Sequence, residues 1–535
     1  MAQDMVTEAD RTTPSIWEPL RDHVFRALWL AVLGSQIGTW MQTVGAQWLL
    51  VDEPNAATLV SLVQTAMMLP ILILAVPAGV LADSLDRRRM LIIVQLFQAA
   101  AGAVLTLLAL AGQLTPALLL TLTFVLGCGG AMTIPTYQAV IPELVPRSQL
   151  QAASGLGAVS MNVARAVGPA AAGVLVAHVG PAAVFALNTA TFLAFAAVLL
   201  LWRRRPTSEE QDPEPFVAAL RAGGRYVRHS RAMRRFLLRV SLFVAPAVAL
   251  WALLPLVASD RLHMSASGYG TLLAALGVGA IGGALVMPRI QARITDNQLL
   301  LFATVIYAAV LAVVAFVPNP VVVTIALVPA GTAWMAVLAN VNAIVQMFLP
   351  RWVRARGLGA YQLVFFGGQA VGSVLWGLAA DHIGLVGAFA IAAVLTGVGA
   401  VTLRWWPLIE TRHLDREPVV VWPDPDLAVD PDPHAGPVVI TSTYTVPGGA
   451  EPEFLAAMRD IRRMRMRTGA VQWGIYRHGE SGDKLIEIYV VPTWDEHLRQ
   501  HNVRLTGADR DIYLRASTLA DGRPEVAHLL PADSG

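Results

Sequence analysis

Polar side chains recur at regular intervals within the first long apolar segment of the chain. Gln36, Trp40, Thr43 and Gln47 follow one another at spacings of four, three and four residues, which places them on one face of a helix. Polar groups in so apolar a segment either line a water-accessible path or join neighbouring helices by hydrogen bonds. We favour the path, where amide, hydroxyl and indole groups offer hydrogen bonds to a small molecule.

Arg165 is the strongest single candidate, because it stands near the middle of another apolar segment. A charge at that depth in a membrane costs roughly 3 kcal/mol or more, so it needs a partner or a function. The acidic residues map near segment ends instead, at Asp52, Glu53, Asp83, Glu143, Asp260 and Asp381. Two alternatives follow: Arg165 is a structural strut that bonds to carbonyls and glutamines, or it contacts an anionic or oxygen-rich substrate.

A second polar stripe lies in the eleventh apolar segment, at Gln362, Gln369, Ser373 and Trp376. The single cysteine, Cys128, excludes an intrachain disulfide framework and a cysteine-based metal cluster. The sequence offers neither a nucleophile constellation nor a metal triad. We therefore expect a protein that is not an enzyme, with no catalytic residue, metal or cofactor.

The composition requires lipid as the solvent for most of these segments. Of 535 residues, 55% are hydrophobic and only 14% charged, whereas soluble domains have about 25% charged residues. The net charge of +2 gives no sign of a nucleic-acid partner. The sequence contains twelve apolar runs of about the length that crosses a bilayer. They are 26–50, 58–82, 90–112, 116–141, 152–177, 181–202, 236–258, 267–288, 297–317, 320–348, 356–380 and 384–406.

Arginines alternate between the two sides of these spans. Positive charges near the ends of membrane spans are retained on the cytoplasmic side. If the N-terminus is cytoplasmic, all of the arginine clusters fall in cytoplasmic loops, and the short loops on the other side contain only Arg261. We therefore expect a multi-pass protein of the cytoplasmic (inner) membrane with both termini cytoplasmic. The predicted parts are an N-terminal segment (1–25), a six-helix bundle (26–202), a cytoplasmic linker (203–235), a second six-helix bundle (236–406), a Pro-rich linker (407–436) and a soluble domain (437–525).

The two bundles match each other at a constant offset of 204 residues. Pro146-Arg147 corresponds to Pro350-Arg351, and His178-Val179-Gly180 corresponds to His382-Ile383-Gly384. A parallel duplication of six helices is typical of transporters, whose substrate site lies near the bilayer midplane between the repeats.

The loop after the second span, Gly79-Val80-Leu81-Ala82-Asp83-Ser84-Leu85-Asp86-Arg87-Arg88-Arg89, resembles the signature of the major facilitator superfamily. This resemblance implies a cytoplasmic latch that includes Gly79, Asp83, Arg87 and Arg88, although Ser84 and Asp86 depart from the usual pattern. It also implies that residues of the fourth and tenth spans face the central path, here Thr136, Tyr137 and Asn340.

The fifth span contains Gly168-Pro169, which resembles the motif of the exporter branch of that superfamily. The start of the chain around Phe25-Arg26 and the run Pro142-Glu143-Leu144-Val145-Pro146 are similar to the transmembrane secretion effector group, which includes enterobactin-type exporters. This likeness implies outward movement of small molecules, gating at Glu143, Gly168 and Pro169, and proton exchange. The titratable groups that could exchange protons are Glu143, Asp83 and His178, and none of them lies at the membrane midplane.

The soluble domain shows a βαββα pattern of ferredoxin-like type. Strands are predicted at 438–446, 471–477 and 485–491, helices at 451–467 and 493–505, and a last strand near 513–519. The pattern resembles the dimeric α+β barrels of the antibiotic-biosynthesis monooxygenase group, which implies a homodimer through this domain. Four residues could line a pocket in this domain: Trp473, Tyr476, His497 and His501. We favour the alternative, in which they are ordinary core and surface residues.

These observations predict an all-α membrane protein with the 12-helix major facilitator fold and a small C-terminal α+β domain. The expected function is secondary active export of a drug or siderophore-like metabolite, coupled to protons. An importer of the same fold is the first alternative. A transporter whose C-terminal domain senses a ligand or acts as an enzyme is the second.

Overall fold

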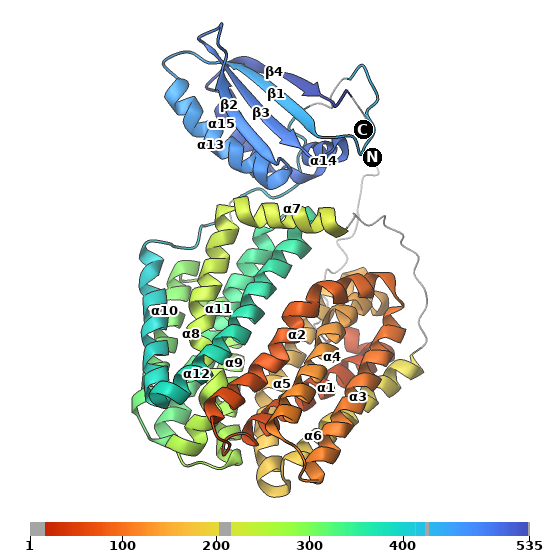
Figure 1. Ribbon diagram of the computed structural model, residues 1–535, viewed down its shortest axis with the longest axis vertical. Coiled ribbons are helices and arrows are strands. Elements are labelled where there is room, and N and C mark those ends of the chain that lie inside the picture. Colours follow the sequence, from red (N-terminus) through yellow and green to blue (C-terminus); the bar gives the residue numbers. More distant parts are fainter. Residues whose placement is uncertain (1–16, 203–215, 412–413, 423–426, 533–535) are drawn as a thin grey trace, which may run out of the picture. The chain divides into compact units, whose positions relative to one another are not determined.

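The computed structural model describes residues 17–202, 216–411, 414–422 and 427–532, and Figure 1 shows their helices and strands. The N-terminal half forms six long helices: α1 (His23–Trp48), α2 (Ala56–Ser84), α3 (Arg87–Leu110), α4 (Pro116–Leu144), α5 (Leu150–Val179) and α6 (Pro181–Leu201). Several begin where side chains satisfy free backbone N–H groups. Asp22 accepts from Val24 and Phe25, and Asp86 accepts from Arg89.

The second half repeats this arrangement after one additional helix. Its elements are α7 (Phe216–His229), α8 (Arg231–Leu256), α9 (Ala266–Gln291), α10 (Asp296–Phe316), α11 (Pro320–Phe348) and α12 (Arg354–Val401). The backbone of α12 leaves the helical region at Gly384, where φ is 75°, so α12 consists of two helices joined at a kink. These correspond to the predicted spans 356–380 and 384–406, and a 3-10 turn at Thr402–Arg404 follows the second helix. The helix α7 lies within the predicted linker and was not expected from the sequence.

By length and composition, ten helices of the described chain can cross a membrane, and α12 with its flanking turns counts as one of them. The helix α1 is 26 residues long but is not among the ten. This mostly helical architecture confirms the predicted fold class.

The duplication is visible in the helix boundaries themselves. Helices α4 and α11 begin at Pro116 and Pro320 and end at Leu144 and Phe348, each pair 204 residues apart. A short 3-10 turn follows in both halves, at Arg147–Gln149 and Arg351–Val353. The glycines with positive φ, Gly180 and Gly384, keep the same offset. A repeat in caps and turns as well as in composition identifies the halves as two copies of one unit.

The C-terminal domain is an antiparallel sheet with helices on one face. Its elements are β1 (Val438–Thr445), α13 (Glu451–Thr468), β2 (Gln472–Arg477), β3 (Lys484–Val491), α14 (Trp494–Arg499), α15 (Gly507–Ser517) and β4 (Asp521–Leu529). The strand order β2-β3-β1-β4 and the βαββαβ connectivity are those of the ferredoxin-like fold. The predicted strand near 513–519 is wrong. Those residues lie in α15 and the turn after it, because the reciprocal cap of Thr506 and Asp509 starts a helix there.

The core of this domain contains a buried polar network. The Arg465 guanidinium pairs with Glu487, with Nε 3.1 Å from Oε1. Trp473 Nε1 donates to the same oxygen at 2.9 Å, and the Tyr444 hydroxyl donates to Glu487 Oε2 at 3.4 Å. Burial acts to lower the pKa of Arg465, but the Glu487 carboxylate together with Tyr489 and Tyr444 outweighs it, and the net shift is upward. Each charge is thus satisfied by a partner within the domain.

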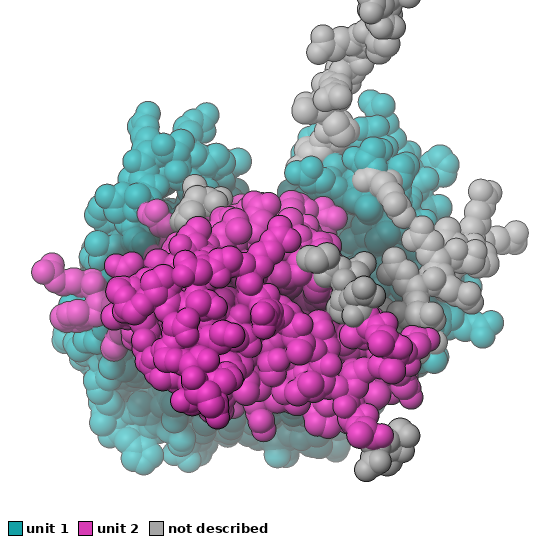
Figure 2. All heavy atoms as spheres, turned by 90° about the horizontal axis from the view of Figure 1, so that it is seen from above, with its two compact units in different colours: residues 1–209, 241–338, 363–403 teal, residues 210–240, 339–362, 404–535 magenta. Residues whose placement is uncertain are grey.

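The chain divides into two compact units, which Figure 2 colours separately. Unit 1 comprises residues 1–209, 241–338 and 363–403, and unit 2 comprises 210–240, 339–362 and 404–535. Within unit 2, Glu496 of α14 pairs with Arg225 of α7 at 3.3 Å and with Arg504 at 2.5 Å. The Arg504 guanidinium also lies 5.0 Å from the Trp352 ring centroid. These contacts hold the C-terminal domain against α7 and the turn after α11.

Candidate functional site

The arginines of the predicted latch join three helices of the N-terminal bundle. Arg87 Nη1 donates to Glu143 Oε1 at 2.8 Å and to the Ala139 carbonyl at 3.1 Å. Arg88 donates to the Leu199 and Leu200 carbonyls at 2.8 and 2.9 Å. The start of α3 is thereby tied to the ends of α4 and α6. Gly79 and Asp83 lie on α2, but their side chains are outside the described residues.

The polar stripe of α1 contacts three different helices. Gln36 accepts a hydrogen bond from Ser160 of α5 at 3.3 Å, and Gln47 accepts one from the Tyr269 hydroxyl of α9 at 2.7 Å. Thr43 donates to the Met67 sulfur of α2 at 3.0 Å. Both Thr43 and Gln47 are buried. These three members of the stripe therefore form hydrogen bonds between helices, which is the alternative to lining a water-accessible path.

Trp40, the remaining member of that stripe, lies beside Arg165. The guanidinium carbon is 5.6 Å from the indole centroid, a cation–π distance. Gly168 permits this approach, since a Cβ at that position would lie 2.7 Å from the Cβ of Trp40. Arg165 Nε is buried and has no hydrogen-bond partner in the described part of the chain. The exporter-type glycine therefore brings together an aromatic ring and a cation that lacks a counter-charge.

A chain of aromatic side chains extends from Trp40 to helices α8, α11 and α12. Trp40 lies 6.0 Å from Trp251 of α8, which lies 5.6 Å from Trp334 of α11. Trp334 in turn is 6.5 Å from Phe365 of α12. Sequence reasoning missed Trp251, Trp334 and Tyr269. Large aromatic residues in the seventh, tenth and eighth spans were the available signal, but apolar segments contain many such residues.

The other predicted cavity residues are divided between the two units. Thr136 is buried and donates to the Met132 carbonyl at 2.7 Å, and Tyr137 packs edge-on against Phe195 inside the N-terminal bundle. Gln369 is buried in α12 within unit 1. Asn340 is buried and Gln362 is exposed, and both belong to unit 2.

Small residues and hydrogen bonds join the two six-helix groups. A Cβ on Gly173 of α5 would stand 2.9 Å from the Gly270 Cα of α9. Thr58 N donates to the Asp381 carboxylate at 3.0 Å, and Thr65 donates to the Ala370 carbonyl at 3.0 Å, both linking α2 to α12. Pro169 is buried at the same α5–α9 crossing, where its carbonyl would lie 3.0 Å from a Cβ on Gly270. Close backbone approach of this kind is how membrane helices pack tightly.

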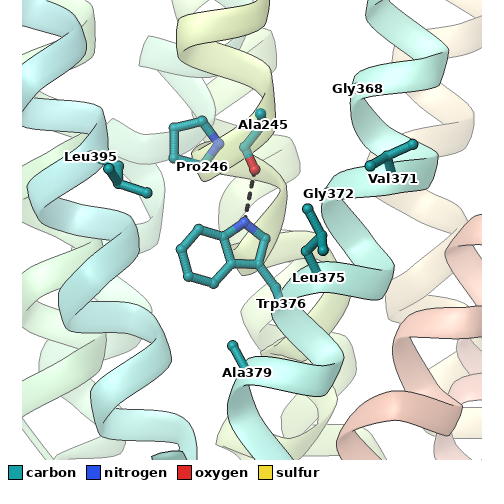
Figure 3. A pocket seen from close by; sticks show the side chains of 9 residues that line it. All are labelled: Ala245, Pro246, Gly368, Val371, Gly372, Leu375, Trp376, Ala379 and Leu395. Carbon is teal, nitrogen blue, oxygen red and sulfur yellow. Dashed lines mark hydrogen bonds between the residues drawn. The ribbon is translucent and has the colours of Figure 1, made fainter.

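A cavity of about 330 Å³ lies beside α8 and α12 (Figure 3). All of its lining residues are apolar: Ala245, Pro246, Gly368, Val371, Gly372, Leu375, Trp376, Ala379 and Leu395. The one polar side-chain group, Trp376 Nε1, donates to the Ala245 carbonyl at 2.7 Å, as the dashed line shows. The predicted stripe residue Trp376 thus faces an apolar cavity that lacks a charged group.

The C-terminal domain separates the residues proposed for its pocket. Trp473 is on the helix-covered face of the sheet, whereas Tyr476 is on the opposite face and is 58% exposed. His497 is buried with its ring 4.9 Å from that of His528, and burial together with His528 lowers the pKa of His497 to about 3. In the described residues, no group of three His, Cys, Asp or Glu side chains could hold a metal ion.

Known proteins resemble this chain over most of its length. The multidrug efflux pump Tap of Mycobacterium tuberculosis is 27% identical over 403 residues, which cover 72% of this chain and 94% of that protein. The staphyloferrin A transporter of Staphylococcus aureus is 22% identical and covers 67% of this chain and 90% of its own length. The crystal structure of the nucleoside transporter NupG superposes with a TM-score of 0.58 at 14% identity, over 72% of this chain and all of that one.

A family model extends beyond these relatives into the C-terminal domain. The model described as transmembrane secretion effector matches residues 14–534. The duplicated helices, the transporter neighbours and this match confirm the transporter part of the predicted resemblance. These matches do not confirm the monooxygenase-like part, although the C-terminal domain does contain a small sheet. The chain belongs to the transmembrane secretion effector family of major facilitator transporters.

Proposed function

We propose that this protein exports small molecules across the cytoplasmic membrane as a secondary active transporter. The names of its relatives support export of drugs or siderophore-like metabolites, since they include a multidrug efflux pump and a staphyloferrin A transporter. In this proposal both termini are cytoplasmic, in line with the arginine-rich loops on that side.

One observation carries the mechanism: several contacts between the two six-helix groups occur at matching helix ends. Gln47 and Gly173 lie toward the C-terminal ends of α1 and α5, while Thr58 and Gly270 lie toward the N-terminal ends of α2 and α9. Because helices alternate in direction across a membrane, all of these ends are on the side opposite to the N-terminus. With a cytoplasmic N-terminus, these contacts would close the outer side of the transporter, as alternating access requires of an inward-facing state.

In this mechanism the substrate contacts Trp40 and Arg165, which lie inward of the seal. Rocking of one bundle against the other would break the α5–α9 and α2–α12 contacts and open the outer side. The Arg87–Glu143 pair at the cytoplasmic end of the N-terminal bundle would then help to stabilise the outward state. Proton exchange is supported by the family resemblance, and Glu143 is the titratable group with a described partner.

A homodimer through the C-terminal domain is the second part of the proposal. Helices cover one face of its sheet, while Ile486, Ile488 and Val490 lie on the other face. Apolar side chains on an uncovered sheet face favour pairing with a second copy. A ligand-sensing or enzymatic role of this domain remains the alternative, and the buried His497 is the observation that favours it.

The direction of transport can be measured in cells that lack their own exporters. We expect cells that express the protein to lose preloaded aromatic dyes faster than control cells, and a protonophore to remove the difference. An importer would instead raise the steady dye content. The dyes should include anionic, neutral and cationic molecules, so that the measured direction of transport does not depend on which charge the protein accepts.

A reversible cross-link tests the alternating-access step. In a Cys128→Ser background, the pair Thr58→Cys and Asp381→Cys replaces a hydrogen-bonded contact between α2 and α12. Oxidation should stop export and reduction should restore it, whereas each single variant should be unaffected by oxidation. Undiminished export by the fully cross-linked protein would contradict the mechanism.

A further inference from the structure

Arg165 has no acceptor among the described residues, in contrast to Arg88 and Arg261 of the same unit. Arg88 donates to the Leu199 and Leu200 carbonyls, and Arg261 donates to the Ala315 carbonyl at 2.6 Å. Arg165 makes no hydrogen bond or ion pair with any described residue, and its buried Nε has no partner. A structural strut would use carbonyls or glutamines as those arginines do. The arrangement therefore leaves the guanidinium available to a bound molecule.

The guanidinium is also within reach of such a molecule. Arg165 and Trp40 are both partly exposed, whereas Ser160, one and a half turns away on α5, is fully buried. Ser160 donates to Gln36, so this amide is already occupied. Arg165 thus provides unused hydrogen-bond donors beside an accessible aromatic ring.

The neighbouring groups set the chemistry that fits. The ring centroids of Trp40 and Trp251 lie 6.0 Å apart with their planes tilted by 49°, and an indole face is a surface on which a flat molecule can stack. A guanidinium pairs best with a carboxylate or similar planar anion, through two parallel hydrogen bonds. In unit 1, the described carboxylates lie at or near the ends of the helices or, for Asp381, near the break of α12 at Gly384: Glu18, Asp22, Asp52, Glu53, Asp86, Glu143, Asp260, Asp296 and Asp381. A cationic ligand would therefore face a like charge with no compensating carboxylate.

We propose that Arg165, with Trp40 and Trp251, forms a binding site selective for flat aromatic molecules that carry an anionic oxygen group. This inference rests on the proposed transport function, because it specifies the substrate class of the same site. The aromatic rings bind the apolar body of the substrate. Arg165 pairs with its anionic group and disfavours cations of the same shape.

Shape-matched probes test this selectivity in the purified full-length protein. The probes are 2-naphthoate, the neutral 2-naphthamide and the cationic 2-naphthylmethylammonium, whose affinities are measured by equilibrium dialysis against empty micelles. We expect 2-naphthoate to bind at least ten-fold more tightly than the cation, equivalent to about 1.4 kcal/mol. Arg165→Gln should remove this preference, and Arg165→Lys should keep part of it because charge remains without the planar fork.

Arg261→Gln is the matched control, since it removes an arginine whose guanidinium already has a carbonyl acceptor. It should leave the preference for 2-naphthoate unchanged. Equal affinity of the wild-type protein for anion and cation, or an unchanged preference in Arg165→Gln, would overturn the inference. The elution profile of the purified protein in size-exclusion chromatography shows whether Arg165→Gln is folded. If it is misfolded, the inference is tested by the Arg165→Lys variant and by the affinities of the wild-type protein for the three probes.

Binding and transport fail in distinguishable ways. If dye export occurs without charge preference in binding, only the substrate class is wrong. If the anion preference is present but cells accumulate dye, the proposed direction is wrong while the site stands.

Discussion

Two arginines with aromatic neighbours, the partly exposed Arg165 in the helical region and the buried Arg465 in the C-terminal domain, have opposite surroundings. Arg465 pairs with Glu487 at 3.1 Å and lies 4.6 and 4.2 Å from the Trp422 and Tyr489 ring centroids. Arg165 has a tryptophan ring at 5.6 Å but no described anion. Aromatic contact alone therefore does not define the role of such an arginine. The carboxylate beside Arg465 gives it a structural pair, whereas the lack of a described carboxylate beside Arg165 is the reason that we propose a binding role for it.

The largest expected effect comes from giving Arg465 the environment of Arg165. Glu487→Gln removes the counter-charge and leaves a buried cation, which should destabilise the C-terminal domain by about 3–5 kcal/mol. Hydrogen exchange in the full-length protein measures this as a loss of protection, on the order of 100-fold or more, in peptides from β1 and β3. Glu525→Gln is the control, because Glu525 is exposed on β4. Equal protection in both variants would show that the pair is not structural.

His497 shows a second way to bury a basic group, which is to keep it neutral. Burial together with His528 lowers its pKa to about 3, compared with 6.5 for an ordinary histidine. The folded state then binds fewer protons than the unfolded state between these two values. The stability contributed above pH 6.5 is therefore lost as the pH falls from about 6.5 toward 3, by about 1.4 kcal/mol per pH unit.

This loss amounts to about 2 kcal/mol between pH 6.5 and 5. Urea unfolding of the C-terminal domain, followed by hydrogen exchange at several pH values, measures it. His497→Phe retains a ring without a titrating group, so its stability should change less over the same range. If the variant and the wild-type protein lose equal stability, the neutral-histidine account fails.

The smallest effect is expected when Arg165 receives the carboxylate that Arg465 already has. Met161 lies four residues before Arg165 on α5 and is 40% exposed, so Met161→Glu places an acidic group within pairing distance. The new pair should compete with an anionic substrate and reduce export of 2-naphthoate roughly ten-fold. Met161→Gln is the uncharged control and should export normally. Similar rates in the two variants would argue against competition at Arg165.

Sequence patterns predicted the helices and the C-terminal strands well because both depend on local periodicity. The predicted spans that begin at residues 116 and 320 agree with the starts of α4 and α11 at Pro116 and Pro320. The error near 513–519 arose where a capping interaction between Thr506 and Asp509 outweighed strand-like composition.

The surroundings of the site residues were harder to predict, since hydrogen-bond partners come from distant parts of the chain. Nothing local in Gln47 specifies Tyr269 as its partner, 222 residues away. Likewise, the sequence showed Arg165 to be isolated from carboxylates but could not identify Trp40 as its neighbour. The helix α7 was missed because its polar composition resembles a linker.

One crossed measurement tests the comparison of the two arginines most directly. Initial export of 2-naphthoate and hydrogen-exchange protection of β1 and β3 are measured together for Arg165→Gln and Arg465→Gln. We predict that Arg165→Gln lowers export at least ten-fold, equivalent to about 1.4 kcal/mol, and leaves protection unchanged, while Arg465→Gln reduces protection. Export at the wild-type rate by a folded Arg165→Gln variant would contradict the central claim that this unpaired arginine binds the substrate.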